Sequence, residues 1–450
     1  MLMACEEIYS YYSEIIRKNS NIQNEMFEKY NVKRGLRNAD GTGVLVGLTE
    51  IGDVHAYIMD EGEKIPVEGR LRYRGIDIYD IVNGFVSENR LGFEETCYLL
   101  LFGELPNEQQ LNQFCQLLGS KRELPEYFAE DMILKAPSKD IMNKLARAVL
   151  ALYSYDDNPD DTSVENTLRQ CIELIARFPA MAAYGYQAKR HYHDGQSLFL
   201  HSPRPELSTA ENILHMIRPD CTYTRSEVEI LDLLLVLHAE HGGGNNSTFA
   251  TRVVSSSGTD TYSAIASAIG SLKGPKHGGA NIKVMQMMEN IKANVKNWSD
   301  EGEVSDYLVK ILKKEANDGS GLIYGIGHAV YTLSDPRAVL LKTKAEELAK
   351  ETGHEEEYNL FTTIERLAPE VFAKVKKSDK VVSANVDFYS GFVYKSLGIP
   401  VELYTPLFAI SRIAGWSAHL LEEIINGGRI IRPAYKNVKG KIPYKSLKDR

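Results

Sequence analysis

Segments with the periodicity of amphipathic helices follow one another along most of the chain, and they constrain its fold more than any other feature. The stretch 93–101 repeats apolar residues at helical spacing, and Gly103 and Pro106 then indicate a stop. Asn107 is suited to cap the next helix. The sequence therefore predicts a mainly α-helical fold. Further helices are predicted over 141–153, 164–188, 226–238, 263–272, 305–315, 338–350 and 406–423.

One early segment, 42–73, departs from this helical pattern. It is rich in glycine, valine and threonine with short alternating stretches, which predicts a few short strands near the N-terminus. A chain of 450 residues exceeds the usual size of a single core, so two domains are expected. Charged helices between 279 and 398, followed by a return to apolar helix, favour an inserted domain. We expect a large domain over 1–278 and 399–450 and a small domain over 279–398.

The composition is that of a folded globular protein, with 43% hydrophobic and 25% charged residues. The formal net charge is -9, so no overall field attracts nucleic acid or anionic membranes, and neither is expected as a partner. An anionic substrate would need a local basic pocket. Five scattered cysteines without CxxC spacing argue against disulfides and zinc, and the first thirty residues lack a signal-peptide pattern. We expect a cytoplasmic protein without membrane insertion.

Three histidines stand in glycine-rich turns that follow helical segments. His241 precedes Gly242-Gly243-Gly244, His277 lies in the stretch 274–281, and His328 follows Gly325-Ile326-Gly327. Glycine lets the backbone approach a ligand closely and adopt positive φ. One such histidine would most simply be structural, but three in the same context favour proton transfer, for which imidazole is suited near neutral pH.

Two other kinds of site compete with this interpretation. A metal could be held by imidazoles with a carboxylate such as Asp387, but no HxxxH or HxxE pair places two of the three histidines on one helical face, and no metal is expected. The triple glycine could cradle phosphate, but GxxxxGK[ST] is absent. A binding module without catalysis would not explain why proton-transfer residues accompany arginines.

Three arginines, Arg337, Arg412 and Arg432, stand at short breaks or helix boundaries. Most arginines are solvated surface charges. A dicarboxylate ligand, however, needs several guanidinium groups, because bidentate contacts to carboxylates supply both charge and orientation.

Taken in order, these residues resemble the citrate synthase family. The likeness covers most of the chain from about Gly41 onward, whereas the segment before it carries no motif of the family. The matching stretches are 69–76, 102–106, 241–247, 274–281, 324–337, 385–390, 411–412 and 432–433.

The resemblance implies a citrate synthase-like helical fold and a homodimer whose large and small domains close over the substrates. In that family the residue matching Asp387 removes a methyl proton from acetyl-CoA. The residue matching His277 stabilises the enol, and the one matching His328 hydrogen-bonds or protonates the carbonyl of oxaloacetate.

The resemblance also implies the binding residues. His241, Arg337 and Arg412 would hold oxaloacetate, and Arg432 would come from the other subunit. No cofactor is expected to bind tightly, because coenzyme A enters as the thioester substrate. It would lie along the backbone of Gly321, Leu322, Ile323, Tyr324 and Gly325.

Two stretches depart from the family pattern. Residues 331–334 read Tyr-Thr-Leu-Ser where a basic residue often serves the phosphates of coenzyme A, which leaves Lys273, Lys276 and Lys342 as candidates. The loop after His241 carries three glycines and a doubled asparagine where many relatives have a glutamate and one asparagine.

Two alternatives to citrate synthase stay open. A 2-methylcitrate synthase would use propionyl-CoA with the same proton-transfer groups, and one methylene in the acyl pocket is worth only ~1–3 kcal/mol. A protein that binds acyl-CoA or a dicarboxylate without catalysis would keep the fold, although it would not need all three of His277, His328 and Asp387.

Overall fold

The computed structural model describes residues 5–38, 41–61, 63–328, 330–377 and 381–450, so Ala329 of the third histidine motif lies outside the described residues. The chain forms two compact units. The larger comprises Thr49–Ile431, and the smaller combines the residues up to Leu48 with Arg432–Arg450.

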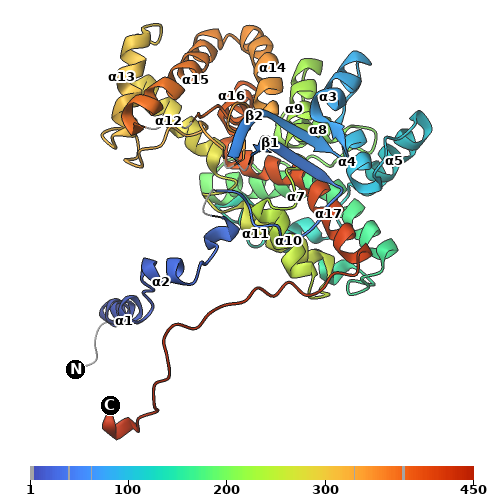
Figure 1. Ribbon diagram of the computed structural model, residues 1–450. Helices are drawn as coiled ribbons and strands as arrows, with labels where there is room; N and C mark the ends of the chain where they lie inside the picture. Colours follow the sequence, from blue (N-terminus) through green and yellow to red (C-terminus); the bar gives the residue numbers. More distant parts are fainter. Residues whose placement is uncertain (1–4, 39–40, 62, 329, 378–380) are drawn as a thin grey trace. The chain divides into compact units, whose positions relative to one another are not determined.

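Helices dominate the part of the chain that the structure describes (Figure 1), which confirms the mainly α fold. The helices are α1 (Cys5–Asn19), α2 (Asn24–Lys29), α3 (Ile78–Ser87), α4 (Phe93–Phe102), α5 (Glu108–Ser120), α6 (Ile141–Leu152), α7 (Val164–Asp194), α8 (Thr209–Ile217), α9 (Arg225–His238), α10 (Asn246–Ser255), α11 (Thr261–Leu272), α12 (Ala280–Asn294), α13 (Glu301–Leu312), α14 (Pro336–Thr352), α15 (Glu355–Lys376), α16 (Val386–Ser396) and α17 (Tyr404–Ile425).

The strands form one antiparallel sheet in the order β1 (Gly52–Asp60), β2 (Glu63–Tyr73) and β3 (Ile76–Asp77). Gly52 pairs with Tyr73, and the register shifts between His55 and Tyr57. The few strands predicted near the N-terminus are confirmed, with 9 residues in β1, 11 in β2 and 2 in β3. The buried residues of β2 lie toward Tyr73, and its other end is exposed.

Several helices begin where the sequence supplies a cap. The side chain of Asn107 accepts a hydrogen bond from the backbone N–H of Gln110, and Oε1 of Gln110 accepts one from the backbone N–H of Asn107. The predicted cap of α5 is therefore confirmed. Thr224 and Glu227 form the same reciprocal pair at the start of α9. This cap begins the helix that leads to the first histidine turn.

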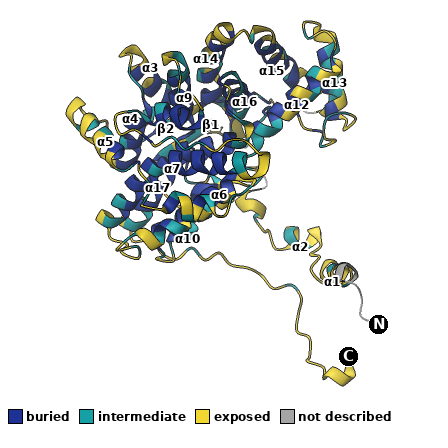
Figure 2. Ribbon diagram, turned by 180° about the vertical axis from the view of Figure 1, so that it is seen from behind, coloured by how far each residue is buried: buried dark blue, intermediate teal, exposed yellow. Residues whose placement is uncertain are grey.

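Two long helices, α7 and α17, form the centre of the larger unit and are buried along most of their length (Figure 2). They pack against each other, and α17 also contacts α4, α9, α10 and α11. Helices α12, α13, α15 and α16 lie together at one side of the same unit (Figure 1), with α13 packed on α15 and α12 on α16. Helices α9, α10 and α11, which lead into or follow the turns of His241 and His277, are thus packed on α17.

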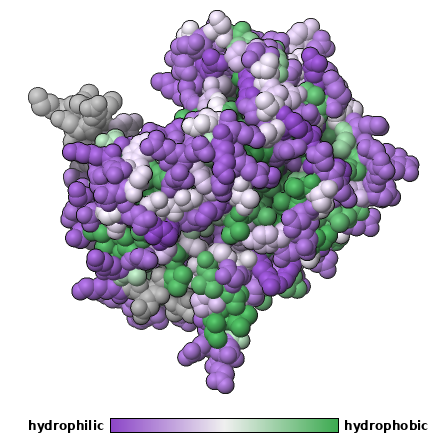
Figure 3. Space-filling view, turned by 90° about the horizontal axis from the view of Figure 1, so that it is seen from above, coloured by the Kyte–Doolittle hydropathy of each residue, from purple (hydrophilic) through white to green (hydrophobic). Residues whose placement is uncertain are grey.

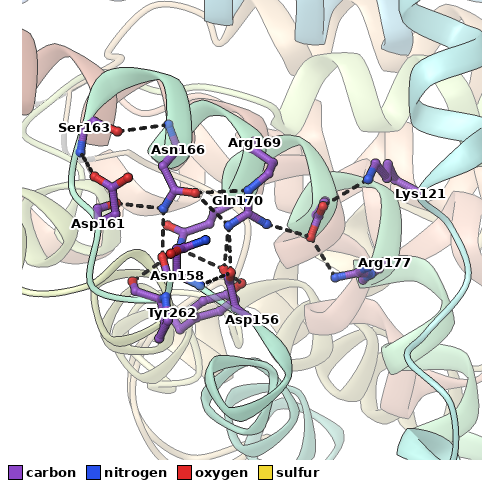
Figure 4. Close-up of polar contacts among 12 residues, drawn as sticks. Lys121, Asp156, Asn158, Asp161, Ser163, Asn166, Arg169, Gln170, Arg177 and Tyr262 are labelled. Carbon is purple, nitrogen blue, oxygen red and sulfur yellow. Dashed lines mark hydrogen bonds and ion pairs between the residues drawn. The ribbon is translucent and has the colours of Figure 1, made fainter.

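The start of α7 is held by a polar network around Asp156 (Figure 4). The carboxylate accepts hydrogen bonds from Arg169 at 2.7 Å, from Gln170 at 2.9 Å and from the hydroxyl of Tyr262 on α11 at 2.7 Å. Burial alone would raise the pKa of Asp156, but these bonds and one from the backbone N–H of Asn158 lower it to about 2. The charged network joins α7 to α11, at whose end His277 follows.

The surface seen from above is mostly hydrophilic, with apolar side chains showing in separate patches (Figure 3). Among the described helices, none combines the length and the apolar character needed to cross a bilayer.

Candidate active site

The structure brings His241 and His328 together around the ring of Tyr331. The centroids of the two imidazoles lie 5.1 Å apart, and Tyr331 stacks on His328 at 4.8 Å with an interplanar angle of 29°. His241 meets the same tyrosine edge-on at 5.5 Å. His241 follows α9 by a few residues, and His328 precedes α14, so the contact joins segments that are distant in the sequence.

Backbone contacts determine which nitrogen of His328 carries the proton. The N–H groups of Val330 and Tyr331 point at Nδ1 from 3.0 and 3.1 Å. Because a backbone N–H can only donate, Nδ1 must be an acceptor and the proton of the neutral ring resides on Nε2. Nε2–H is therefore the donor of the neutral His328 ring, and a nitrogen of this kind can hydrogen-bond to a carbonyl oxygen.

His277 lies just after α11, and its Nε2 stands 3.0 Å from Oγ of Ser247 in α10. The same hydroxyl accepts a hydrogen bond from Nε1 of Trp416 at 3.1 Å. Burial, followed by the positive charge of Arg412, lowers the pKa of His277 to about 4. His277 is therefore a neutral imidazole whose orientation is set by α10 and α17.

Asp387 stands in the first turn of α16, where the side chain of Asn385 accepts its backbone N–H at 3.0 Å. Burial raises the pKa of its carboxyl to about 6, with Asp335 adding to the rise and Arg337 and Arg412 opposing it. A carboxylate with this pKa is ionised at neutral pH yet basic enough to accept a proton.

The segments that carry His328 and Asp387 are tied to each other through a short antiparallel bridge between Ile326 and Ala384. The N–H of Gly327 donates to the carbonyl of Ser383 at 2.7 Å, and the N–H of Asn385 donates to Gly325 at 2.9 Å. The bridge holds these two predicted proton-transfer residues in one local structure.

Arg412 is fully buried in α17, and its Nε donates to the carbonyl of His238 at 2.6 Å. Its Nη1 and Nη2 have no hydrogen-bond partner among the described residues, and neither does Nε2 of the buried His241. Burial lowers the pKa of Arg412 to about 10, which still leaves it charged. A buried cation with two unpaired donor nitrogens is what an anionic ligand requires.

Arg337 is also buried, and it forms a bidentate pair with Asp335, Nε to Oδ1 at 3.0 Å and Nη2 to Oδ2 at 2.7 Å. Its guanidinium lies 5.7 Å from the centroid of Tyr331, which places it beside the two histidines. Arg432 belongs to the smaller unit and is exposed. Its contribution to the oxaloacetate site of another subunit therefore stays a prediction.

The stretch 321–325 predicted for coenzyme A contains two glycines that the backbone requires. Gly321 and Gly325 have φ of +74° and +80°, and a Cβ on Gly325 would lie 2.7 Å from the ring of Phe388. This packing places the stretch against the helix of Asp387. Two lysines considered for the phosphates have acidic partners, Lys273 with Asp140 at 3.0 Å and Lys342 with Glu365 at 2.5 Å.

Some residues around the site could not be assigned from the sequence. Ser247 and Asp335 lie inside stretches that match the family, but no role was predicted for either. No feature of the sequence singled out Trp416. Ser247 and Trp416 act through contacts with distant segments, and Asp335 joins its near neighbour Arg337 to the distant Val386. Contacts across such distances leave no local pattern. No group of three or more His, Cys, Asp or Glu side chains arranged to hold a metal occurs among the described residues.

Comparison with known families decides what kind of protein carries this site. A family model described as citrate synthase, C-terminal domain, matches residues 38–434. The chain belongs to the citrate synthase family. Members of this family are acyltransferases, and the chain is an enzyme of that type, as its motifs predicted.

Relatives within the citrate synthase family cover most of the chain. A citrate synthase of Synechocystis is 35% identical, with 81% of this chain and 84% of the relative covered. A 2-methylcitrate synthase of Shewanella oneidensis is 33% identical, over 81% of this chain and 87% of the relative.

A solved structure shows the same fold. It is the ternary complex of carboxymethyl coenzyme A and oxaloacetate with the citrate synthase of Thermoplasma acidophilum, which superposes with a TM-score of 0.75 at 26% identity and covers 93% of this chain and 99% of its own.

Proposed function

We propose that the chain condenses acetyl-CoA with oxaloacetate and water to give citrate and coenzyme A. The observation that carries the proposal is the buried guanidinium of Arg412 with two unused donors, next to neutral histidines and a carboxyl whose pKa is about 6. Such a site is built to hold an anion beside a base. The relative bound to oxaloacetate and a coenzyme A analogue supports the same pair of substrates.

In this mechanism Asp387 takes a proton from the methyl group of acetyl-CoA, and His277 hydrogen-bonds to the oxygen of the resulting enol. The enol carbon attacks the keto carbon of oxaloacetate, while Nε2–H of His328 supplies a hydrogen bond or proton to the keto oxygen. Water then hydrolyses the citryl thioester and releases coenzyme A. A positioned donor at an oxyanion contributes about 2.7–4 kcal/mol in comparable sites.

Oxaloacetate binding is assigned to His241, Arg337 and Arg412, with Arg432 of a second copy completing the site in a homodimer. Coenzyme A is a substrate in this scheme and passes along 321–325. We further propose a cytoplasmic enzyme with a small domain over 279–398 that closes onto the large domain. Calorimetric titration of an unreactive acetyl-CoA analogue should show tighter binding when oxaloacetate is present, since a ligand gripping both domains favours closure. Equal affinities would remove domain closure from the proposal.

The 2-methylcitrate synthase of Shewanella oneidensis keeps propionyl-CoA as the second candidate acyl donor. Steady-state rates with acetyl-CoA and with propionyl-CoA, each with oxaloacetate, measured by release of free thiol, distinguish the two. We expect the larger kcat/KM with acetyl-CoA. A larger value with propionyl-CoA would assign the second function, and no turnover with either would overturn both.

A further inference from the structure

Asp335 is a buried carboxylate that the mechanism above does not use. It is 1% exposed and directly precedes α14. Its Oδ1 accepts the backbone N–H and Nε–H of Arg337, both at 3.0 Å. Its Oδ2 accepts Nη2–H of Arg337 at 2.7 Å and the backbone N–H of Val386 at 3.2 Å. All four contacts therefore lead to two residues in different segments.

Each of these two partners leads directly to a residue of the proposed site. Arg337 is one of the arginines assigned to oxaloacetate. Val386 is the first residue of α16, and Asp387 follows it. The N–H groups of a first helical turn have no partner inside the helix. The side chain of Asn385 accepts the backbone N–H of Asp387, and Asp335 accepts the backbone N–H of Val386. The orientation of the base therefore depends on both of these caps.

The charge of Asp335 argues against direct contact with substrate. A carboxylate would repel the dianion oxaloacetate. The free-energy cost of burying the charge of Asp335 is offset by its bidentate pair with Arg337. That pair occupies the Nε and Nη2 edge of the guanidinium and leaves Nη1 outside it. Asp335 thus restrains the direction in which Arg337 can present its remaining N–H donors.

We propose that Asp335 is a positioning residue that holds the oxaloacetate arginine Arg337 and the helix of the base Asp387 in one fixed relation. This inference rests on the proposed function. Because both partners share one carboxylate, a change at Asp335 should affect substrate affinity and the behaviour of the base together.

The test is Asp335→Asn, with Asp232→Asn as the matched control. Asp232 is likewise buried, and it accepts the backbone N–H groups of Gly92 and Phe93 at the start of α4. An asparagine at 335 keeps one acceptor oxygen and turns an NH2 group toward donors, so two of the four bonds are lost. We expect the KM for oxaloacetate to rise tenfold or more in Asp335→Asn and to stay within twofold in the control.

The pH profile separates positioning from loss of fold. The charged and titratable groups acting on Asp387 are Asp335, Arg337, Arg412 and Tyr394. Removing the negative charge at 335 takes away a carboxylate that raises the pKa of Asp387 and keeps the positive charges of both arginines, so the acid limb of kcat/KM should move to lower pH. Asp335→Glu keeps the charge but displaces it, and should raise the KM without moving the limb, which provides a test if the asparagine variant fails to fold.

The inference is overturned if wild-type enzyme is active and both Asp335 variants retain its KM and its acid limb. It is equally overturned if Asp335→Asn and Asp232→Asn lose activity to the same extent with unchanged KM. An inactive wild type would instead overturn the proposed function, so the two failures are distinguishable.

Discussion

Oγ of Ser247 lies 3.0 Å from Nε2 of His277, and this contact links the hydroxyl to the tautomer of the imidazole. The hydroxyl accepts a hydrogen bond from Trp416, whose indole can only donate. The hydroxyl carries one hydrogen, and two acceptors lie within its reach, Oδ1 of Asn245 at 2.9 Å and Nε2 of His277 at 3.0 Å. When that hydrogen is directed to Nε2, the proton of neutral His277 resides on Nδ1. That nitrogen could then donate to an enol oxygen, which is the role proposed for this residue.

Ser247→Ala should therefore lower kcat about tenfold, the equivalent of one hydrogen bond of about 1.4 kcal/mol, because His277 loses its tautomer preference. The KM for oxaloacetate should change less than twofold. Ser255→Ala is the control, since its Oγ bonds to the carbonyl of Arg252 in the same helix. Steady-state kinetics that give both variants the same kcat would contradict this role for Ser247.

Asp387→Asn should abolish condensation and leave oxaloacetate binding largely intact, because the carboxylate serves as the base and not as a grip on that substrate. In the wild type, kcat/KM should fall as the pH drops through about 6, where Asp387 becomes protonated. Titration calorimetry of the variant with oxaloacetate tests whether binding is retained, and a pH–rate profile of the wild type tests the fall in kcat/KM. Near-normal turnover by the variant would remove Asp387 from the mechanism.

The same carboxyl should cost stability at neutral pH. Its pKa is raised by burial from 3.8 to about 6 in the folded chain, so the folded state holds a proton in that range which the unfolded state has released. Stability from this group is consequently lost as the pH rises from about 4 through 6. Asp387→Asn avoids that loss and should be more stable at pH 7.5, by up to about 3 kcal/mol. Denaturant unfolding at several pH values should show this advantage shrinking toward pH 4, and a less stable variant at pH 7.5 would refute the prediction.

Arg412→Ala and Arg432→Ala homodimers should each bind oxaloacetate poorly, and mixing them should restore part of the activity. If Arg432 serves the neighbouring subunit, a mixed dimer contains one site with both substitutions and one with neither. Activity after subunit exchange is the measurement. Absence of recovery, with exchange demonstrated independently, would place both arginines in the same subunit's site.

Much of the helical architecture could be predicted because its signals are local. Helix α9 was expected over 226–238 and spans Arg225–His238, since the cap at Thr224 and the glycines after His241 delimit it. The helix expected over 305–315 instead spans Glu301–Leu312, because Asp300 caps it earlier and Lys314, at φ +67°, ends it sooner. Helix ends depend on caps and left-handed residues that periodicity alone does not locate.

The site was only partly predictable for the same reason. Motifs indicated His241, His277, His328 and Asp387 one by one, since each stands in a distinctive turn. The contacts that orient them, such as those made by Ser247 and Asp335, join segments brought together by the packing of α10 on α11 and of α14 on α16. A single sequence contains no record of which side chains meet across such a distance.

The bridge between Ile326 and Ala384 has a consequence for how the enzyme would lose activity. It is short, and structures of this kind open locally at lower cost than a packed core. His328 closely follows Ile326 in the sequence, and Asp387 closely follows Ala384. One local opening of the bridge would therefore displace both residues. Mild heating should then inactivate the enzyme in a single reversible step while most of its helices remain folded.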